Sequence, residues 1–187
     1  CVSLRVPVAS FRPSAGQRRA RRQASGLTRE VSRPQVDGER LDLYRRWHAH
    51  RESSRGWEAS PLDAERYAFE FAFPHPAVRE VSFRDPRADD RLVGLGIVDE
   101  VPGALSAVYF FWDPEQAPAA LGTAHIVFLI DEAAARRFDV VYLGYRVTDC
   151  PSLAYKSRFG PHELLDGRPG PRDRPFWRRP VVAPDGA

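Results

Sequence analysis

Two aspartates of this chain lie where a carboxylate can take part in proton transfer. Asp99 ends one predicted strand, and Asp113 follows the aromatic strand Tyr109-Phe-Phe-Trp112. A carboxylate at the end of a strand is well placed to accept a proton from a bound substrate. Asp in such positions more commonly caps a turn through hydrogen bonds to the nearby backbone. Spacing alone favours turn capping for both residues.

Aromatic hydroxyls and cations gather toward the C-terminal part of the chain. Tyr142-Leu-Gly-Tyr145 reads as a strand, and a glycine inside a strand often marks the close approach of a ligand or of another backbone. Tyr155-Lys156-Ser-Arg158 places two cations at a predicted helix end. They complement the helix dipole there and are also suited to bind a carboxylate. Lys156 is the only lysine among the 28 basic residues, and its compact ammonium differs from the planar arginine fork.

Positive charge is concentrated near the N-terminus. Residues 1–36 carry eight arginines against one glutamate, although the net charge of the whole chain is only +3. A short helix predicted over residues 13–23 presents Gln17, Arg18, Arg19 and Arg22, and such a face suits phosphate contacts. A basic segment ahead of a mildly acidic body fits a polyanionic partner, with a solvated basic linker as the alternative.

Composition excludes several classes of protein. The 187 residues are enough for one globular domain, and the chain has no run of about 18 apolar residues that would predict a membrane span. The first residues lack the apolar region of an export signal. Two cysteines, Cys1 and Cys150, cannot make a disulfide framework or a metal site by themselves, so we expect a cytoplasmic, reducing environment. Because the chain begins with Cys, we expect its N-terminus to be cut.

Hydrophobic periodicity predicts the elements that must position these residues. Helices are expected over residues 13–23, 38–51, 60–73, 121–138 and 152–158, and strands over 2–8, 78–83, 91–101, 105–112 and 140–145, with 28–36 extended. A turn at residues 99–104 joins two strands into an antiparallel hairpin. This order predicts an α/β (α+β) fold, a mixed and mainly antiparallel sheet flanked by helices, and it is the order that the GNAT acyltransferase fold uses.

One glycine pattern is similar to a coenzyme A site but lies in the wrong context. Arg91-Leu-Val-Gly94-Leu-Gly96 fits the loop with which acetyltransferases cradle pyrophosphate. That loop must lie between a strand and a helix N-terminus, where free N–H groups meet phosphate. Here the pattern opens a strand, and residues 112–123 contain no such pattern. Coenzyme A binding is therefore not favoured.

Several segments, taken in order, are similar to one known family. They are residues 1–19, 44–57, 99–114 and 120–123, and the most specific block, Tyr142-Leu-Gly-Tyr145 with Cys150-Pro-Ser-Leu-Ala-Tyr155-Lys-Ser-Arg158-Phe-Gly-Pro161. Over residues 1 to about 166 the chain resembles the bacterial aminoacyl-tRNA–protein transferases, which are arginyltransferases and aspartate/glutamate leucyltransferases. Residues 15–16, 52, 146 and 160 depart from the family pattern.

The resemblance implies a domain organisation and a set of partners. Residues 1–36 would be the end of a cysteine-rich N-terminal domain, residues 37–166 a GNAT-like catalytic domain and residues 167–187 a flexible tail. The donor would be a tRNA charged with Arg or Leu. The acceptor would be a protein with N-terminal Asp or Glu, tagged for degradation in the N-degron pathway. Cys1 would belong to a cluster that holds a metal or iron–sulfur centre in the missing part, with no cofactor in this fragment. A monomer without membrane contact is expected.

The implied reaction is aminolysis of an activated ester, which requires that two substrates be oriented and a tetrahedral oxyanion stabilised. Asp99 is assigned as the base or amine anchor, with Tyr109 and Tyr142 lining the site. Tyr145, Tyr155, Lys156 and Arg158 are assigned to the acceptor, and Gln17, Arg18, Arg19 and Arg22 to the tRNA. Three alternatives stay open: an acyl-CoA-dependent GNAT acetyltransferase, a catalytically silent tRNA- or degron-binding relative, and a fragment that does not fold alone. The sequence does not choose between Arg and Leu as donor.

Overall fold

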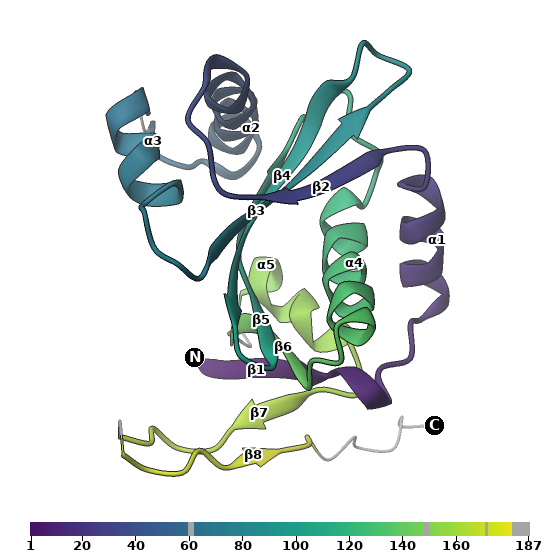
Figure 1. Ribbon diagram of the computed structural model, residues 1–187, viewed down its shortest axis with the longest axis vertical. Helices are drawn as coiled ribbons and strands as arrows, with labels where there is room; N and C mark the ends of the chain where they lie inside the picture. The colour runs from purple at the N-terminus through teal and green to yellow at the C-terminus, as the bar shows by residue number, and fades with distance from the viewer. Residues whose placement is uncertain (60–61, 148–149, 171, 181–187) are drawn as a thin grey trace.

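The computed structural model describes residues 1–59, 62–147, 150–170 and 172–180, which form one sheet with helices on both faces (Figure 1). In the described part of the chain the sheet has eight strands in the order β2-β3-β4-β5-β6-β1-β7-β8. The strands are β1 (Val2–Pro7), β2 (Thr28–Ser32), β3 (Val78–Asp85), β4 (Arg91–Val101), β5 (Ala104–Trp112), β6 (Val140–Arg146), β7 (Glu163–Leu165) and β8 (Trp177–Arg178). β5 and β6 run parallel, and the other paired strands are antiparallel. This arrangement confirms the predicted mixed, mainly antiparallel sheet.

The helices divide the hydrophobic core into two layers. They are α1 (Ala15–Gln23), α2 (Gly38–Arg55), α3 (Ala64–Phe71), α4 (Leu121–Ala135) and the short α5 (Pro151–Ala154), which continues as the 3-10 turn η2 (Tyr155–Arg158). α1 and α4 pack together on one face of the sheet, and α2 and α3 cover the other (Figure 1). β4 is therefore buried on both faces, which explains its continuous apolar run.

Local sequence signals explain where the helices begin and end. Ser14 and Gln17 form a reciprocal capping box at the start of α1. The carboxylates of Asp37 and Asp63 cap α2 and α3 by accepting backbone N–H groups of the first turn. Gly56 ends α2 in the left-handed conformation, with φ of 64°.

The parallel pairing of β5 and β6 is short, and this creates the site. It joins Ala104–Ser106 to Val140–Tyr142 and goes no further. Just beyond, the register of β5 against β4 shifts between Ile97 and Val98, and Val108 has no partner of its own. A β-bulge of this kind bends a strand and re-aims its side chains. The second half of β5 is thus free of β6 and faces a cavity.

Some boundaries differ from the predicted ones. The helix expected from residue 60 begins at Ala64 in the structure, and the predicted cap at residues 60–61 lies outside the described residues. α4 ends at Ala135 rather than at residue 138. Within the expected flexible tail, Trp177–Arg178 pairs with β7, so part of that segment belongs to the sheet. β1 lies between β6 and β7 in the same sheet. No helix in the described ranges is long and apolar enough to cross a membrane.

Candidate functional site

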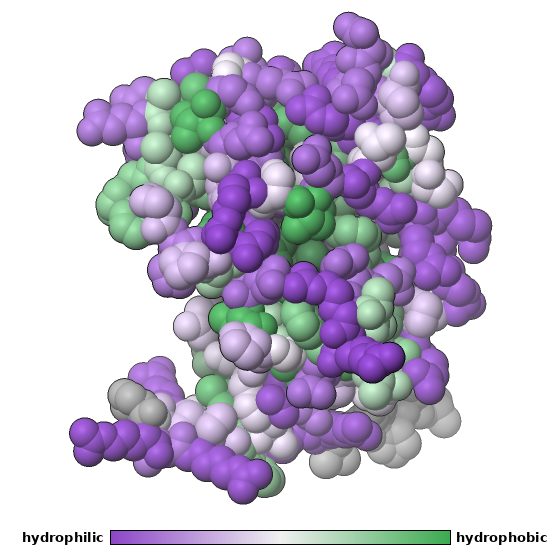
Figure 2. All heavy atoms as spheres, viewed as in Figure 1, coloured by the Kyte–Doolittle hydropathy of each residue, from purple (hydrophilic) through white to green (hydrophobic). Residues whose placement is uncertain are grey.

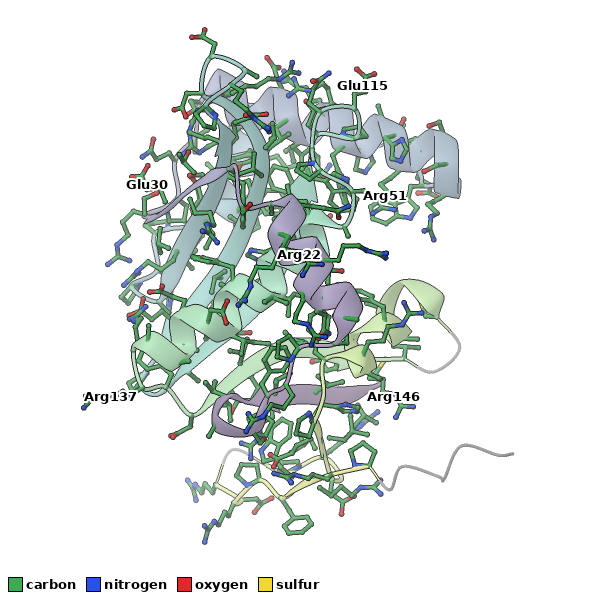
Figure 3. All side chains as sticks on the ribbon, turned by 90° about the vertical axis from the view of Figure 1, so that its right-hand side faces the viewer. Arg22, Glu30, Arg51, Glu115, Arg137 and Arg146 are labelled. Atoms are coloured by element: carbon green, nitrogen blue, oxygen red, sulfur yellow. The ribbon has the colours of Figure 1, made fainter. Side chains whose placement is uncertain are left out.

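A cavity of about 730 Å³ opens where β5 leaves β6. The second half of β5 and Leu143 of β6 line it from the sheet. The C-terminal end of α2, the loop 114–120, the first turns of α4 and the α5–η2 segment complete its wall. Figure 3 labels Arg51 beside α2. The cavity thus lies where six segments of the chain meet.

Aromatic rings and cations make up the wall near α2. The Arg51 guanidinium carbon lies 5.4 Å from the Trp47 ring centroid and 4.8 Å from that of Trp112. Trp57 packs edge-on against Trp47 at 5.5 Å and is 46% exposed. Burial, together with the neighbouring Arg55, lowers the pKa of Arg51. These contacts hold a half-buried cation against apolar rings.

The charge of the cavity has one sign. Arg51, Arg55 and Lys156 line it, and no carboxylate does so among the residues that the structure describes. Burial lowers the pKa of Lys156, which has no ion-pair partner in the described ranges. A half-buried cation without a counter-ion is costly in free energy. The cavity is therefore suited to a ligand that brings an anionic group and apolar surface.

Lys156 reaches the cavity past a glycine of β6. Gly144 has φ of 74°, and a Cβ built there would lie 3.4 Å from the Lys156 ammonium nitrogen. Tyr155 also lines the cavity, and burial raises the pKa of its hydroxyl. The group that lies close to this glycine is the Lys156 side chain, rather than the ligand or backbone that the pattern suggested.

The three residues assigned to catalysis lie apart. Tyr109 lines the cavity, and burial, with Tyr44 and Glu70 nearby, raises its pKa. Asp99 lies on β4 near the hairpin turn, where it pairs with Ser106 of β5. It does not line the cavity. Tyr142 packs against Trp177 at 5.7 Å and does not line it either. The structure therefore does not bring Asp99 and Tyr142 to the same place as Tyr109.

Asp113 has the structural role that spacing favoured. It is 1% exposed and accepts backbone N–H groups of Glu115 and Gln116 at 3.0 and 3.1 Å. Arg46 and Arg91 pair with its other oxygen at 3.2 and 2.9 Å. Burial alone would raise the pKa of Asp113, but these partners outweigh it and lower the pKa. Asp113 fixes the loop between β5 and α4 at the cavity wall.

The remaining assigned residues fall into two groups. Tyr145 is 59% exposed and Arg158 is exposed, and both lie outside the cavity wall. On α1, Gln17 is 4% exposed, and its amide bonds to Ser14 N–H and to the Arg158 carbonyl. The assignment of Gln17 to tRNA binding is wrong, because both the oxygen and the nitrogen of its amide form hydrogen bonds within the protein. Arg18, Arg19 and Arg22 are exposed on the α1 side, where Figure 2 shows a hydrophilic surface.

The glycine pattern of β4 serves packing rather than phosphate binding. A Cβ at Gly94 would come within 2.7 Å of Leu121, and one at Gly96 within 2.4 Å of His125. Both glycines allow α4 to approach the sheet closely. Coenzyme A binding through this pattern is therefore excluded by its position in the strand.

Sequence reasoning missed the cations and tryptophans of α2. Arg51 and Trp57 lie in the segment 44–57 that is similar to the family, and Trp47 lies in the helix predicted over residues 38–51, but none of them was assigned to the site. The available signal was the combination of Trp and Arg residues near one helix end. No three His, Cys, Asp or Glu side chains within the described ranges come together as a metal site, and Cys1 is exposed.

Comparison with known sequences identifies relatives along most of the chain. A family model described as arginine-tRNA-protein transferase, C terminus, matches residues 39–166. The aspartate/glutamate leucyltransferase of Halorhodospira halophila is 39% identical over 168 residues, which cover 90% of this chain and 70% of that protein. The proteins of the same name from Pseudomonas fluorescens and Helicobacter hepaticus are 34% and 30% identical, over 88% and 95% of this chain and 68% and 73% of their own lengths.

Solved structures support the fold. L-PGS from Bacillus licheniformis has a TM-score of 0.57 at 15% identity, over 82% of this chain and 49% of that chain. FemX has a TM-score of 0.55 at 8% identity, over 84% and 57%. Likeness at such identities concerns the fold alone. The predicted fold class, a mixed and mainly antiparallel sheet flanked by helices, is confirmed.

Proposed function

Because this chain belongs to the arginine-tRNA–protein transferase family, we propose that the cavity between β5 and β6 is where it transfers leucine from leucyl-tRNA to an acidic protein N-terminus. The chain is an aminoacyltransferase with a GNAT-like fold, and its partners are an aminoacyl-tRNA donor and a protein acceptor. The observation that carries the finer proposal is a cavity that combines aromatic walls, three cations and, among its described lining residues, no carboxylate.

Leucine is the donor amino acid that suits this cavity. An arginyl side chain would bring a fourth cation beside Arg51, Arg55 and Lys156, without a carboxylate in the described wall to pair with it. A leucyl side chain instead places apolar surface against the rings and alanines of the wall. The names of the relatives point the same way.

Lys156 is the group that we assign to the acidic side chain of the acceptor. It lines the cavity and has no ion-pair partner among the described residues. A charge-assisted hydrogen bond from its ammonium would distinguish Asp or Glu from neutral residues. Tyr155 shapes the same wall, whereas Tyr145 and Arg158 could contact only the part of the acceptor outside the cavity.

The reaction needs orientation more than acid–base groups. The neutral α-amine attacks the ester carbonyl, a C–N bond forms, and the carbonyl oxygen becomes an oxyanion. The bond to the ribose oxygen then breaks, and the proton lost by the amine ends on that oxygen. An α-amine with a pKa near 8 is partly neutral at pH 7, so attack does not require a carboxylate base. The backbone freed by the bulge at Val108 lies in the cavity wall, where it can stabilise the oxyanion, whereas the hydroxyl of Tyr109 is hydrogen-bonded to Tyr44.

The arginines of α1 would hold the body of the tRNA. Arg19 and Arg22 are exposed and have no carboxylate partner in the described ranges, and they supply contacts that carry no sequence information. We further propose that the transferred leucine marks the acceptor for degradation in the cytoplasm, and that Cys1 belongs to a metal-binding cluster of the longer protein.

A transfer assay tests the proposal directly. The chain is incubated with radiolabelled leucyl-tRNA or arginyl-tRNA and peptides that begin with Asp, Glu or Ala. Leucine should appear on the Asp and Glu peptides. Transfer of arginine in preference to leucine would reject the donor assignment, and transfer to Ala peptides at the same rate would reject the acceptor assignment.

A further inference from the structure

The rim of the cavity at the end of α2 carries a cluster of rings and cations to which the proposed reaction assigns no ligand group of its own. The rim cluster consists of Trp47, Arg51, Arg55 and Trp57, which all line the cavity. Trp47 is 4% exposed, whereas Trp57 is 46% exposed and lies past the C-terminal Gly56 of the helix. An accessible ring thus lies beside a buried ring and two cations.

Arg51 differs from the three arginines that precede it in α2. Arg40 pairs with Glu80 and Asp37, Arg45 with Asp42, and Arg46 with Asp113. The Nε atom of Arg51 is buried and has no hydrogen-bond partner among the residues that the structure describes, and its guanidinium faces two indole rings. Its neighbour in the cavity wall is another cation, Arg55, one helical turn later. A ligand with an anionic oxygen would supply the acceptor that this site lacks.

The combination of groups identifies the chemistry of that ligand. Proteins bind single-stranded nucleic acid by stacking bases on exposed aromatic rings and by placing arginines along the backbone. Trp57 offers such a ring, and Arg51 and Arg55 lie on the same stretch of chain, four residues apart. A free carboxylate would use the cations but would leave the exposed indole without a partner. The cluster therefore fits a nucleotide better than an acidic side chain.

We propose that the rim cluster binds the 3′-terminal nucleotide of the donor, with its base on Trp57 and the phosphodiester before it on Arg51 and Arg55. The proposal rests on the proposed function, since it takes an aminoacyl-tRNA as the ligand. It places the ester of the last ribose at the cavity mouth, where the aminoacyl group can enter toward β5. It also separates two anion sites, because Lys156 reaches the cavity from η2, on a different segment.

Two stable donor analogues test the proposal on the whole chain. One is 3′-leucylamido-3′-deoxyadenosine, and the other is the same nucleoside extended at its 5′ side by two cytidylates. The second should bind more tightly, and calorimetry gives the ratio of the two dissociation constants. Arg51→Met should reduce that ratio by about tenfold or more, because a phosphate contact is lost. Trp57→Leu should weaken both analogues by about tenfold, and Trp57→Phe should recover most of this loss.

Controls separate the proposal from folding and from the proposed reaction. Arg45→Met, on the same helix with an exposed side chain, should leave the ratio unchanged. If Arg51→Met does not fold, Arg55→Met at an exposed position should still lower the ratio. An unchanged ratio in both variants, or a loss of preference for Asp-starting peptides with unchanged analogue binding, overturns the proposal. If the protein binds the extended analogue tightly but transfers no leucine, the proposed reaction is wrong and the proposed nucleotide site is supported.

Discussion

The imidazole of His125 occupies the space that a side chain at Gly96 would need. A Cβ at Gly96 would lie 2.4 Å from Cε1 and 2.7 Å from Nε2 of His125. We predict that Gly96→Ala lowers the free energy of unfolding by about 1–3 kcal/mol, because overpacking forces α4 away from β4. Gly38→Ala is the matched control, since a Cβ there would meet nothing within 4 Å. Denaturant unfolding measures both, and the loss should shrink when Gly96→Ala is combined with His125→Ser.

The same histidine should make the fold sensitive to acid. Burial lowers the pKa of His125 from 6.5 to about 3, and in the described part of the chain neither ring nitrogen has a hydrogen-bond partner. Below pH 6.5 the His125 imidazole therefore binds a proton in the unfolded chain but not in the folded chain. The free energy of unfolding falls as the pH falls from 6.5 toward 3. The slope should approach about 1.4 kcal/mol per pH unit. His125→Phe should remove this slope between pH 6.5 and 4.5, and an equal slope in both proteins would contradict the assignment.

Asp99 provides a test of the catalytic assignment made from sequence. Loss of a general base slows a reaction by about 10²- to 10⁴-fold. Because Asp99 lies near the hairpin turn and outside the cavity wall, we predict that Asp99→Asn transfers leucine within about twofold of the wild-type rate. Steady-state kinetics with an Asp-starting peptide measure this. A hundredfold loss with an unchanged melting temperature would show that the carboxylate reaches the substrates.

The α1 arginines should determine the salt dependence of tRNA binding. Each phosphate contact contributes about 0.7–0.9 to the slope of log affinity against log salt. Arg19→Ala combined with Arg22→Ala should lower that slope by about two, because both side chains are exposed and without a carboxylate partner in the described part of the chain. Arg66→Ala on α3, which pairs with Glu70, is the control and should leave the slope unchanged. An unchanged slope in the double variant would mean that α1 does not touch tRNA.

The sequence predicted the elements well because their signals are local. Ser14, Gly56 and the alternation of apolar residues act within a few positions of chain, and the order of elements then limits the possible sheets. The site depends on where the β5–β6 pairing ends and on which arginines form ion pairs with carboxylates. Both features arise from contacts between segments that are far apart in the sequence. Gln17 looked like part of a basic surface but bonds to the Arg158 carbonyl, 141 residues away. In the sequence, nothing distinguishes Arg51 from the other arginines. The structure distinguishes it, because its Nε atom is buried and has no hydrogen-bond partner among the described residues.

Lys156 gives the sharpest test of acceptor recognition. A charge-assisted hydrogen bond contributes roughly 1.5–3 kcal/mol, so Lys156→Ala should compress the preference for Asp-starting over Ala-starting peptides by about ten- to a hundredfold in kcat/KM. Lys156→Arg should rescue poorly, because a planar fork with bidentate geometry does not reproduce the contact of a compact, rotatable ammonium. Arg158→Ala, which removes an exposed cation two residues away, is the matched control and should change the preference little.

The pH dependence of that preference adds a second readout that a purely structural lysine would not affect. Burial lowers the pKa of Lys156, so its ammonium loses its proton at a lower pH than an exposed lysine does. On the alkaline side the preference for acidic acceptors should therefore decline in the wild-type protein and stay flat in Lys156→Ala. A lysine that only complements a helix end would change stability by about 0.3–1 kcal/mol and leave the preference alone. Measuring peptide preference against pH together with thermal melting separates the two roles, and a preference that is the same with and without the ammonium rules out recognition by Lys156.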